Sequence, residues 1–187
     1  MANFTENAFF DTDINLPSTS SSTSEGENLA LFITKWEPKI LAELLGYEFA
    51  KNLIEEFNTD PQPTSGDLFD LWNGAEFTDK HGRLNKWPGF ITKGESLLAN
   101  FIYCQKLRDN DSYTTVAGEA SMKSVNAERV SAANKLVRAW NEAVEWVFLL
   151  DDYLIQNSAK YPLYTGLING YCLGNKRYFT KLTTFGA

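Results

Sequence analysis

The sequence is short of the side chains from which catalytic and metal sites are usually built. Among 187 residues there is one histidine, His81, and there are two cysteines, Cys104 and Cys172. A zinc site made of cysteine and histidine needs about four ligands. A nucleophile activated by histidine would have to use His81, which stands in a turn-like run. We therefore expect no enzymatic activity, no bound metal and no cofactor.

The two cysteines also lack the spacing of a redox or metal motif. They lie far apart with no CxxC pair, and each is flanked by apolar or aromatic residues. Cysteines in such surroundings usually behave as small buried hydrophobes. Cys104 and Cys172 are therefore predicted to be free, buried thiols.

Positive charge and long apolar runs are scarce as well. The 17 basic residues are outnumbered by 24 acidic ones, which gives a net charge of −7. General nucleic-acid binding needs clustered lysine and arginine, so the composition argues against it. No segment approaches the roughly 20 apolar residues of a membrane helix. Residues 1–10 lack a basic region followed by an apolar stretch, so we expect no signal peptide. We expect a protein without a membrane partner, made and used in a cytoplasm-like compartment.

Aromatic residues, in contrast, are abundant. The chain has five Trp, eight Tyr and thirteen Phe, and 43% of its residues are hydrophobic. This is enough apolar material for the core of one domain. Aromatic side chains are also enriched where proteins contact other proteins. The composition therefore favours a folded domain that binds protein partners.

Three amphipathic helices are predicted, over residues 34–57, 93–108 and 131–157. In each segment the apolar residues recur at steps of three and four, which places them on one face of a helix. Thr34 and Glu37 have the spacing of a capping box, so we expect the first helix to begin there. Together the three helices predict a small bundle.

The segments between these helices predict a hairpin and a long loop. Short strand-like runs flank the turn from Asp79 to Gly82, which predicts a β-hairpin at about residues 75–88. Residues 109–130 are rich in Ser, Thr, Asn and Gly. Polar loops of this length inside a compact domain are either disordered or committed to a partner.

Both ends of the chain are predicted to be extended arms. Residues 1–30 include a Ser/Thr-rich stretch that cannot bury enough apolar surface to offset its ordering entropy. Its short apolar pattern fits either a strand that docks on a neighbour or a frayed tail. Residues 161–187 mix aromatics with too many glycines for a stable helix. The predicted contact residues for a neighbouring protein are Tyr161, Tyr164, Tyr171, Tyr178, Phe179, Phe185, Phe9, Phe10 and Ile14.

The predicted fold class is therefore mainly α. We expect a small helical bundle over residues 31–160, with a short β-hairpin and extended N- and C-terminal arms at residues 1–30 and 161–187.

Four blocks of the sequence resemble a known family. They are WEPKILAELLGY at residues 36–47, LWNGAEFT at 71–78, KWPGF at 86–90 and SAANKLVRAWNE at 131–142. Together with a helix ending at Arg108, they resemble virion proteins of phages that infect Bacteroidetes-type bacteria. Members of that family are similar to head-to-tail connector, or adaptor, proteins. The resemblance covers roughly residues 30–157 and leaves out both predicted arms.

The resemblance implies a structural role in the virion. Copies of the chain, most often twelve, would form a homo-oligomeric ring beneath the portal protein and join the head to the downstream neck or tail proteins. DNA would pass through the ring without sequence-specific binding, and the acidic balance of the chain suits such a conduit. The protein would be assembled in the host cytoplasm and end in the neck of the virion.

Three alternatives stay open. Another neck or tail-completion subunit, such as a stopper, would share this physics, although stoppers are usually β-rich. A helical adaptor outside the virion would bind a host protein as a monomer or a dimer. An enzyme with an unrecognised site is disfavoured by the single histidine and the lack of a catalytic motif.

Overall fold

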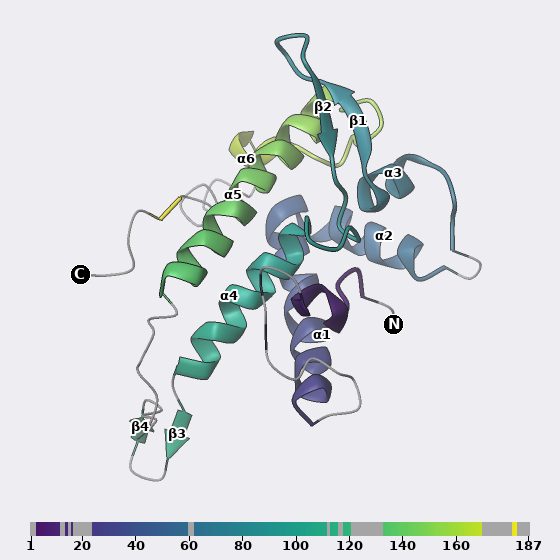
Figure 1. Ribbon diagram of the computed structural model, residues 1–187. Coiled ribbons are helices and arrows are strands. Elements are labelled where there is room, and N and C mark those ends of the chain that lie inside the picture. Colours follow the sequence, from purple (N-terminus) through teal and green to yellow (C-terminus); the bar gives the residue numbers. More distant parts are fainter. Residues whose placement is uncertain are drawn as a thin grey trace.

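The computed structural model describes residues 3–11, 14, 16, 24–59, 62–111, 113–115, 118–120, 133–169 and 181–182. Its elements are a short 3₁₀ helix η1 (Asn7–Asp11), α1 (Ser24–Leu45), α2 (Tyr47–Phe57), α3 (Asp67–Asn73), β1 (Ala75–Thr78), β2 (Leu84–Trp87), α4 (Leu97–Asp111), β3 (Tyr113–Thr115), β4 (Gly118–Ala120), α5 (Ala133–Gln156) and α6 (Gly166–Asn169) (Figure 1). The predicted fold class is confirmed, because the chain is mainly helical and carries an antiparallel hairpin.

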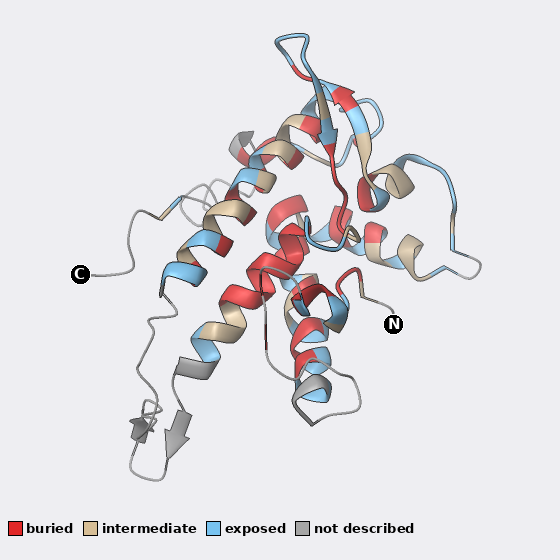
Figure 2. Ribbon diagram, in the orientation of Figure 1, coloured by how far each residue is buried: buried red, intermediate tan, exposed pale blue. Residues whose placement is uncertain are grey.

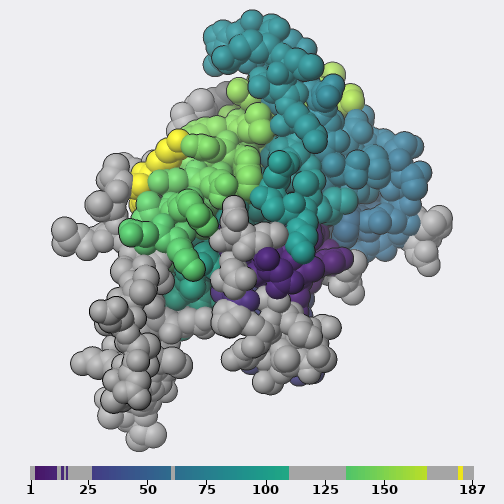
Figure 3. All heavy atoms as spheres, in the orientation of Figure 1, coloured from purple at the N-terminus to yellow at the C-terminus, as the bar shows by residue number. Residues whose placement is uncertain are grey.

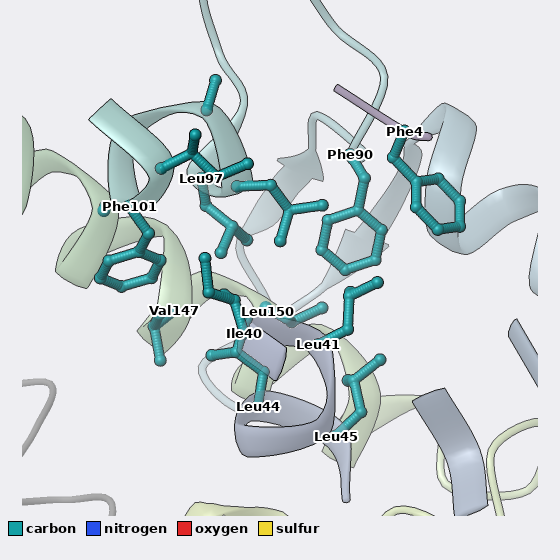
Figure 4. Close-up of a cluster of buried hydrophobic side chains, with 14 of the residues drawn as sticks. Phe4, Ile40, Leu41, Leu44, Leu45, Phe90, Leu97, Phe101, Val147 and Leu150 are labelled. Atoms are coloured by element: carbon teal, nitrogen blue, oxygen red, sulfur yellow. The ribbon is translucent and has the colours of Figure 1, made fainter. Parts of the chain in front are cut away.

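The core forms around α4, which packs against both α5 and α1. In Figure 1, α5 lies on the other side of α4 from α1. The first half of α4 is buried all round, as its uniform red colour in Figure 2 shows. Figure 4 shows side chains of these three helices meeting in one cluster, with Leu97 and Phe101 from α4, Leu41 and Leu44 from α1, and Val147 from α5.

The first predicted helix differs from expectation at both its start and its middle. It begins ten residues earlier, at Ser24, so Thr34 lies inside the helix and its hydroxyl donates to the carbonyl of Ala30. The predicted capping box is therefore wrong. Gly46 divides the predicted helix into α1 and α2, because its φ of +84° is one that glycine adopts without strain. The break redirects α2 so that Phe49 and Leu53 still face the core.

The predicted hairpin is present, with Ala75 opposite Trp87 and Thr78 opposite Leu84. It projects from the body of the molecule, as Figure 3 shows. Asp79 closes its turn by accepting backbone N–H bonds from His81 and Arg83, both to Oδ1. The single histidine is exposed in this turn, as its turn-like sequence context indicated.

The hairpin and α3 are joined by close backbone contacts. The indole N–H of Trp87 donates to the carbonyl of Leu71 over 2.7 Å, and the backbone N–H of Phe90 donates to the carbonyl of Trp72 over 2.8 Å. Gly89 lies directly against this junction with a φ of +88°. The sequence blocks at 71–78 and 86–90 therefore meet in space and form one structural unit.

The predicted loop at residues 109–130 is wrong at its beginning. Helix α4 continues to Asp111, and β3 pairs with β4 in a second antiparallel hairpin. Thr and Tyr, which form β3, are common in strands. The polar composition of the whole segment nevertheless predicted a loop. Residues 121–132 lie outside the described part of the chain.

The described residues of the predicted N-terminal arm pack on the core. Phe9, Phe10 and Ile14 are buried, and η1 contacts α1 and α4. Their burial corrects the expectation that these three side chains are free to grip a neighbour. The physical reason is that α4 has apolar surface on more than one side, and this segment covers part of it. The boundary at residue 30 is also wrong, since it falls inside α1.

No helix within the described residues is both long enough and apolar enough to cross a lipid bilayer.

Gly89→Ala should destabilise the fold strongly. A methyl group at Gly89 would overlap the carbonyl oxygen of Trp72 and lie 2.6 Å from the carbonyl carbon of Asn73. We expect a loss of about 3–5 kcal/mol in the free energy of unfolding, measured with urea. The matched control is Gly82→Ala, which has a φ of +78° but open space around it, and should lose about 1–2 kcal/mol. Equal losses in the two variants would contradict the close packing of this junction.

Candidate interaction surfaces

A buried carboxylate holds the N-terminal segment against α1. The backbone N–H of Phe4 donates to Oε1 of Glu37 over 2.9 Å, and that of Thr5 donates to Oε2 over 2.8 Å. Asn3 adds a bond from its amide to the hydroxyl of Thr34. Glu37 therefore binds a segment more than thirty residues away in sequence rather than capping its own helix.

The ring of Phe4 fills an aromatic socket beside this carboxylate. Its centroid lies 4.1 Å from that of Phe57, 5.8 Å from that of Phe90 and 6.5 Å from that of Trp72. Figure 4 shows Phe4 next to Phe90 at the edge of the core cluster. Aromatic rings at these separations attract one another beyond the gain from their buried area. The first residues of the described chain are thus fixed by both polar and apolar contacts.

Burial raises the pKa of the Glu37 carboxyl from 4.5 to about 7, although the N–H bonds from Phe4 and Thr5 lower it in part. A carboxyl whose pKa is raised by folding favours the folded state most when it is protonated. Its contribution is therefore complete below pH 4.5 and is lost as the pH rises to about 7. The fold should be more stable at mildly acidic pH than above neutrality.

Glu37→Gln should remove this pH dependence, because glutamine does not titrate. In the wild-type chain we expect the free energy of unfolding to fall by on the order of 3 kcal/mol between pH 5 and pH 8, because the pKa of one buried carboxyl is raised by folding. Urea denaturation at the two pH values measures the change. Glu48→Gln, at an exposed position on α2, is the matched control and should keep the wild-type profile. A Glu37→Gln chain with the full wild-type pH dependence would show that another group is responsible.

On the C-terminal side, two tyrosines fix the turn that follows α5. The hydroxyls of Tyr153 and Tyr161 lie 2.9 Å apart, and Tyr161 donates to the carbonyl of Asp67 over 2.7 Å. Burial raises the pKa of both hydroxyls. They stay protonated and cannot act as bases near neutral pH. Tyr161 thus connects α5 with the start of α3.

A pocket of about 360 Å³ opens beside this turn, between α2 and α3. Its polar lining includes Lys160, which is paired with Asp67 and Asp70 at 3.7 Å and 3.4 Å. The hydrogen bond that the Lys160 amine donates to Asp70 raises the pKa of Lys160, so the amine is charged rather than nucleophilic. These groups hold the turn in place. None of Lys160, Asp67 and Asp70 is an activated nucleophile.

Of the nine predicted contact residues, some are buried in the core, one is half-buried and the others lie outside the described residues. Phe9, Phe10, Ile14 and Tyr161 are buried in their own chain, and Tyr164 is half-buried with its hydroxyl donating to Asp151 over 2.6 Å. The structure therefore brings the first three to the α4 side of the core and the two tyrosines to the end of α5. The remaining four lie outside the described residues: Tyr171, Tyr178, Phe179 and Phe185.

A second contact joins residues near the C-terminus to α5. Leu182 and Asn141 exchange two hydrogen bonds of 2.7 Å and 2.9 Å, and Lys181 pairs with Glu145 over 2.6 Å. This described part of the predicted C-terminal arm therefore lies along α5.

Cys104 is a structural thiol, as predicted. It is free and buried, and burial raises its pKa to about 12. Its sulfur lies 3.7 Å from the carbonyl of Leu136. Cys172 falls outside the described residues. Among the side chains that the structure places, no group of three or more His, Cys, Asp or Glu residues could hold a metal ion.

Several apolar side chains that were not predicted as contact residues are left in solvent by the fold. The largest exposures are 77% for Tyr47, 71% for Leu84 and 70% for Leu31. Phe148 and Ile155 of α5 are exposed at 48% and 45%. A helical-wheel view of α5 could have found the last two, because they lie seven residues apart and so share one face. Tyr47 could not be found in this way, since its exposure depends on the break at Gly46.

Comparisons of the chain with protein-family models, with curated proteins and with solved structures gave no match.

Tyr161→Phe should weaken the attachment of the turn after α5. The change leaves the hydroxyl of Tyr153 and the carbonyl of Asp67 each without one partner. We expect a loss of about 1–3 kcal/mol in the free energy of unfolding. Tyr47→Phe is the matched control, because Tyr47 is exposed, and it should change stability by less than about 0.5 kcal/mol. A Tyr161→Phe chain as stable as this control would show that the hydroxyl contacts add nothing.

Proposed function

We propose that this chain is a structural subunit of a phage virion, one copy of a ring that joins the DNA-filled head to the tail. Both the sequence and the fold support the proposal. The sequence blocks at 36–47, 71–78, 86–90 and 131–142 resemble those of connector proteins. The fold also has a complete core and still exposes large apolar side chains, among them Leu31 and Tyr47 on α1–α2 and Phe148 and Ile155 on α5.

The exposed apolar surface is the observation that carries the proposal. A well-packed monomer gains nothing from Tyr47, Leu31, Phe148 or Ile155 in solvent, whereas a subunit of a permanent assembly buries such residues against its neighbours. Obligate interfaces typically remove about 2,000 Å² or more from water. Apolar side chains on both α1–α2 and α5 fit a subunit with more than one neighbour.

Charge supports the same role. The chain has a net charge of −7, and a ring of twelve copies would multiply that charge around a central channel. A negative channel wall repels the phosphates of DNA and lets the DNA slide through without being held. The portal protein above and the neck or tail proteins below would contact the two rims of the ring.

Electron microscopy of the purified full chain tests this proposal. We expect closed rings with a mass of about 250 kDa if twelve copies of the 21.1 kDa chain assemble. Immunogold labelling of phage particles with antibodies against the chain should place gold at the head–tail junction. Label that is absent from the particles would contradict a virion role.

The same experiments separate the two main alternatives. A stopper would also label the neck but would lie further from the head in two-colour labelling with the portal protein. A host-binding adaptor outside the virion would remain a monomer or dimer and would leave the particles unlabelled.

A further inference from the structure

A concave apolar surface lies between α1 and α2, beside the break at Gly46. We call it the α1–α2 groove. It has a volume of about 220 Å³ and is lined by Pro38, Ala42, Tyr47, Ala50, Lys51, Ile54 and Glu55. Most of the lining is apolar, and Tyr47 forms an exposed edge. Exposed tyrosines beside a concave surface are typical of the residues that dominate binding energy at protein interfaces.

Helical geometry extends this surface along α1. Leu31, Lys35, Pro38 and Ala42 follow one another at steps of four, three and four residues, so they share one face. Leu31 is exposed at 70%. The groove is therefore part of a longer face that runs along the outer side of α1 and continues onto α2.

Positive charge borders this face. The amines of Lys35 and Lys39 lie 5.5 Å and 5.1 Å from the ring centroid of Trp36. Neither lysine has a carboxylate partner in the part of the chain that the structure describes. The face thus combines an apolar centre with two lysines whose charge is available to a partner of opposite charge.

A convex surface of complementary character lies on α5. We call it the α5 ridge, formed by Phe148, Asp152 and Ile155, which follow one another at steps of four and three residues on one face. The two apolar members are about half exposed. Asp152 is half-buried and has no hydrogen-bond or ion-pair partner among the described residues. The ridge therefore presents two apolar side chains with one carboxylate between them.

The groove and the ridge lie on different sides of the subunit. Helix α4 packs against both α1 and α5, and Figure 1 shows α5 across α4 from α1. A single subunit cannot bring its own ridge into its own groove. A ring requires contacts of this kind, in which two different faces of each copy meet and the rotation between copies closes.

We propose that, in the ring, the α5 ridge of one copy lies in the α1–α2 groove of the next copy, with Asp152 facing Lys39. This inference rests on the ring assembly proposed above. Phe148 and Ile155 would fill the apolar groove against Tyr47 and Ile54. The carboxylate of Asp152 and the amine of Lys39 would fix the register of the two helices, because opposite charges at an interface select orientation as well as adding affinity.

Site-specific photo-cross-linking tests which faces meet. The photoreactive p-benzoylphenylalanine is placed at Tyr47 of the full chain, and this chain is mixed with an ¹⁵N-labelled copy that carries no cross-linker. The oligomeric state is measured on the same sample by mass photometry before irradiation. We expect cross-links from position 47 to labelled residues 145–156. The same group placed at Leu84, which is equally exposed on the hairpin, should not reach that segment.

Charge reversal gives an independent test of the register. Lys39→Glu and Asp152→Lys should each weaken assembly by about tenfold or more, and the double variant should recover most of the loss. Lys86→Glu makes the same charge change on the hairpin and should leave assembly unchanged. Circular dichroism of each variant confirms that the subunit is folded. Recovery in the double variant cannot come from an effect on subunit stability alone.

The outcomes separate this inference from the proposed function. Oligomers that form but link position 47 to another part of the chain, or to position 47 of a second copy, would overturn the pairing of groove and ridge and leave the ring proposal standing. A lack of recovery in the double variant would overturn the pairing of Asp152 with Lys39. A chain that stays monomeric and is absent from phage particles would overturn both proposals.

Discussion

The structure depends on the first half of α4 being covered on every side. Residues from Leu97 to Cys104 are all buried, so this part of the helix has no face left for solvent. A helix of this kind is stable only inside a core, because each exposed apolar face would cost free energy in water. Helices α1 and α5 cover two sides of it, and η1 contacts it as well. The docking of the N-terminal segment is therefore a consequence of the composition of α4.

This requirement explains why the N-terminal segment was misjudged from sequence. Phe9, Phe10 and Ile14 form too short a pattern to be stable alone, and the Ser/Thr-rich run after them reads as a tail. What fixes the segment is non-local. Glu37 supplies two acceptors for its backbone, and the socket around Phe4 comes from α2, α3 and the segment after β2. Contacts across thirty residues of sequence leave no local pattern, and the spacing of Glu37 from Thr34 pointed to a local cap instead.

The helices and the first hairpin, in contrast, were predictable because their signals are local. Apolar residues at helical spacing placed the three long helices to within a few residues at most ends, and turn residues from Asp79 to Gly82 located the hairpin. The break at Gly46 was missed because one glycine in a strong helical pattern is usually tolerated. That glycine matters for the candidate interaction surface, since the bend it allows creates the α1–α2 groove and exposes Tyr47. The α1–α2 groove thus arises from one backbone conformation at Gly46 that periodicity does not reveal, whereas the exposed face of α5 follows from helical spacing.

The central claim is that a rigid subunit uses spare surfaces on α1–α2 and α5 to join copies, while the core around α4 stays unchanged. Hydrogen–deuterium exchange of the chain at a dilution where it is monomeric, compared with the assembled chain, tests this most directly. The account predicts new protection in α2 and α5 on assembly, with the amides of α4 and of the segment bound to Glu37 equally slow in both states. Protection that instead appears or disappears in α4 or in residues 3–11 would show that assembly rearranges the core, and it would contradict the account.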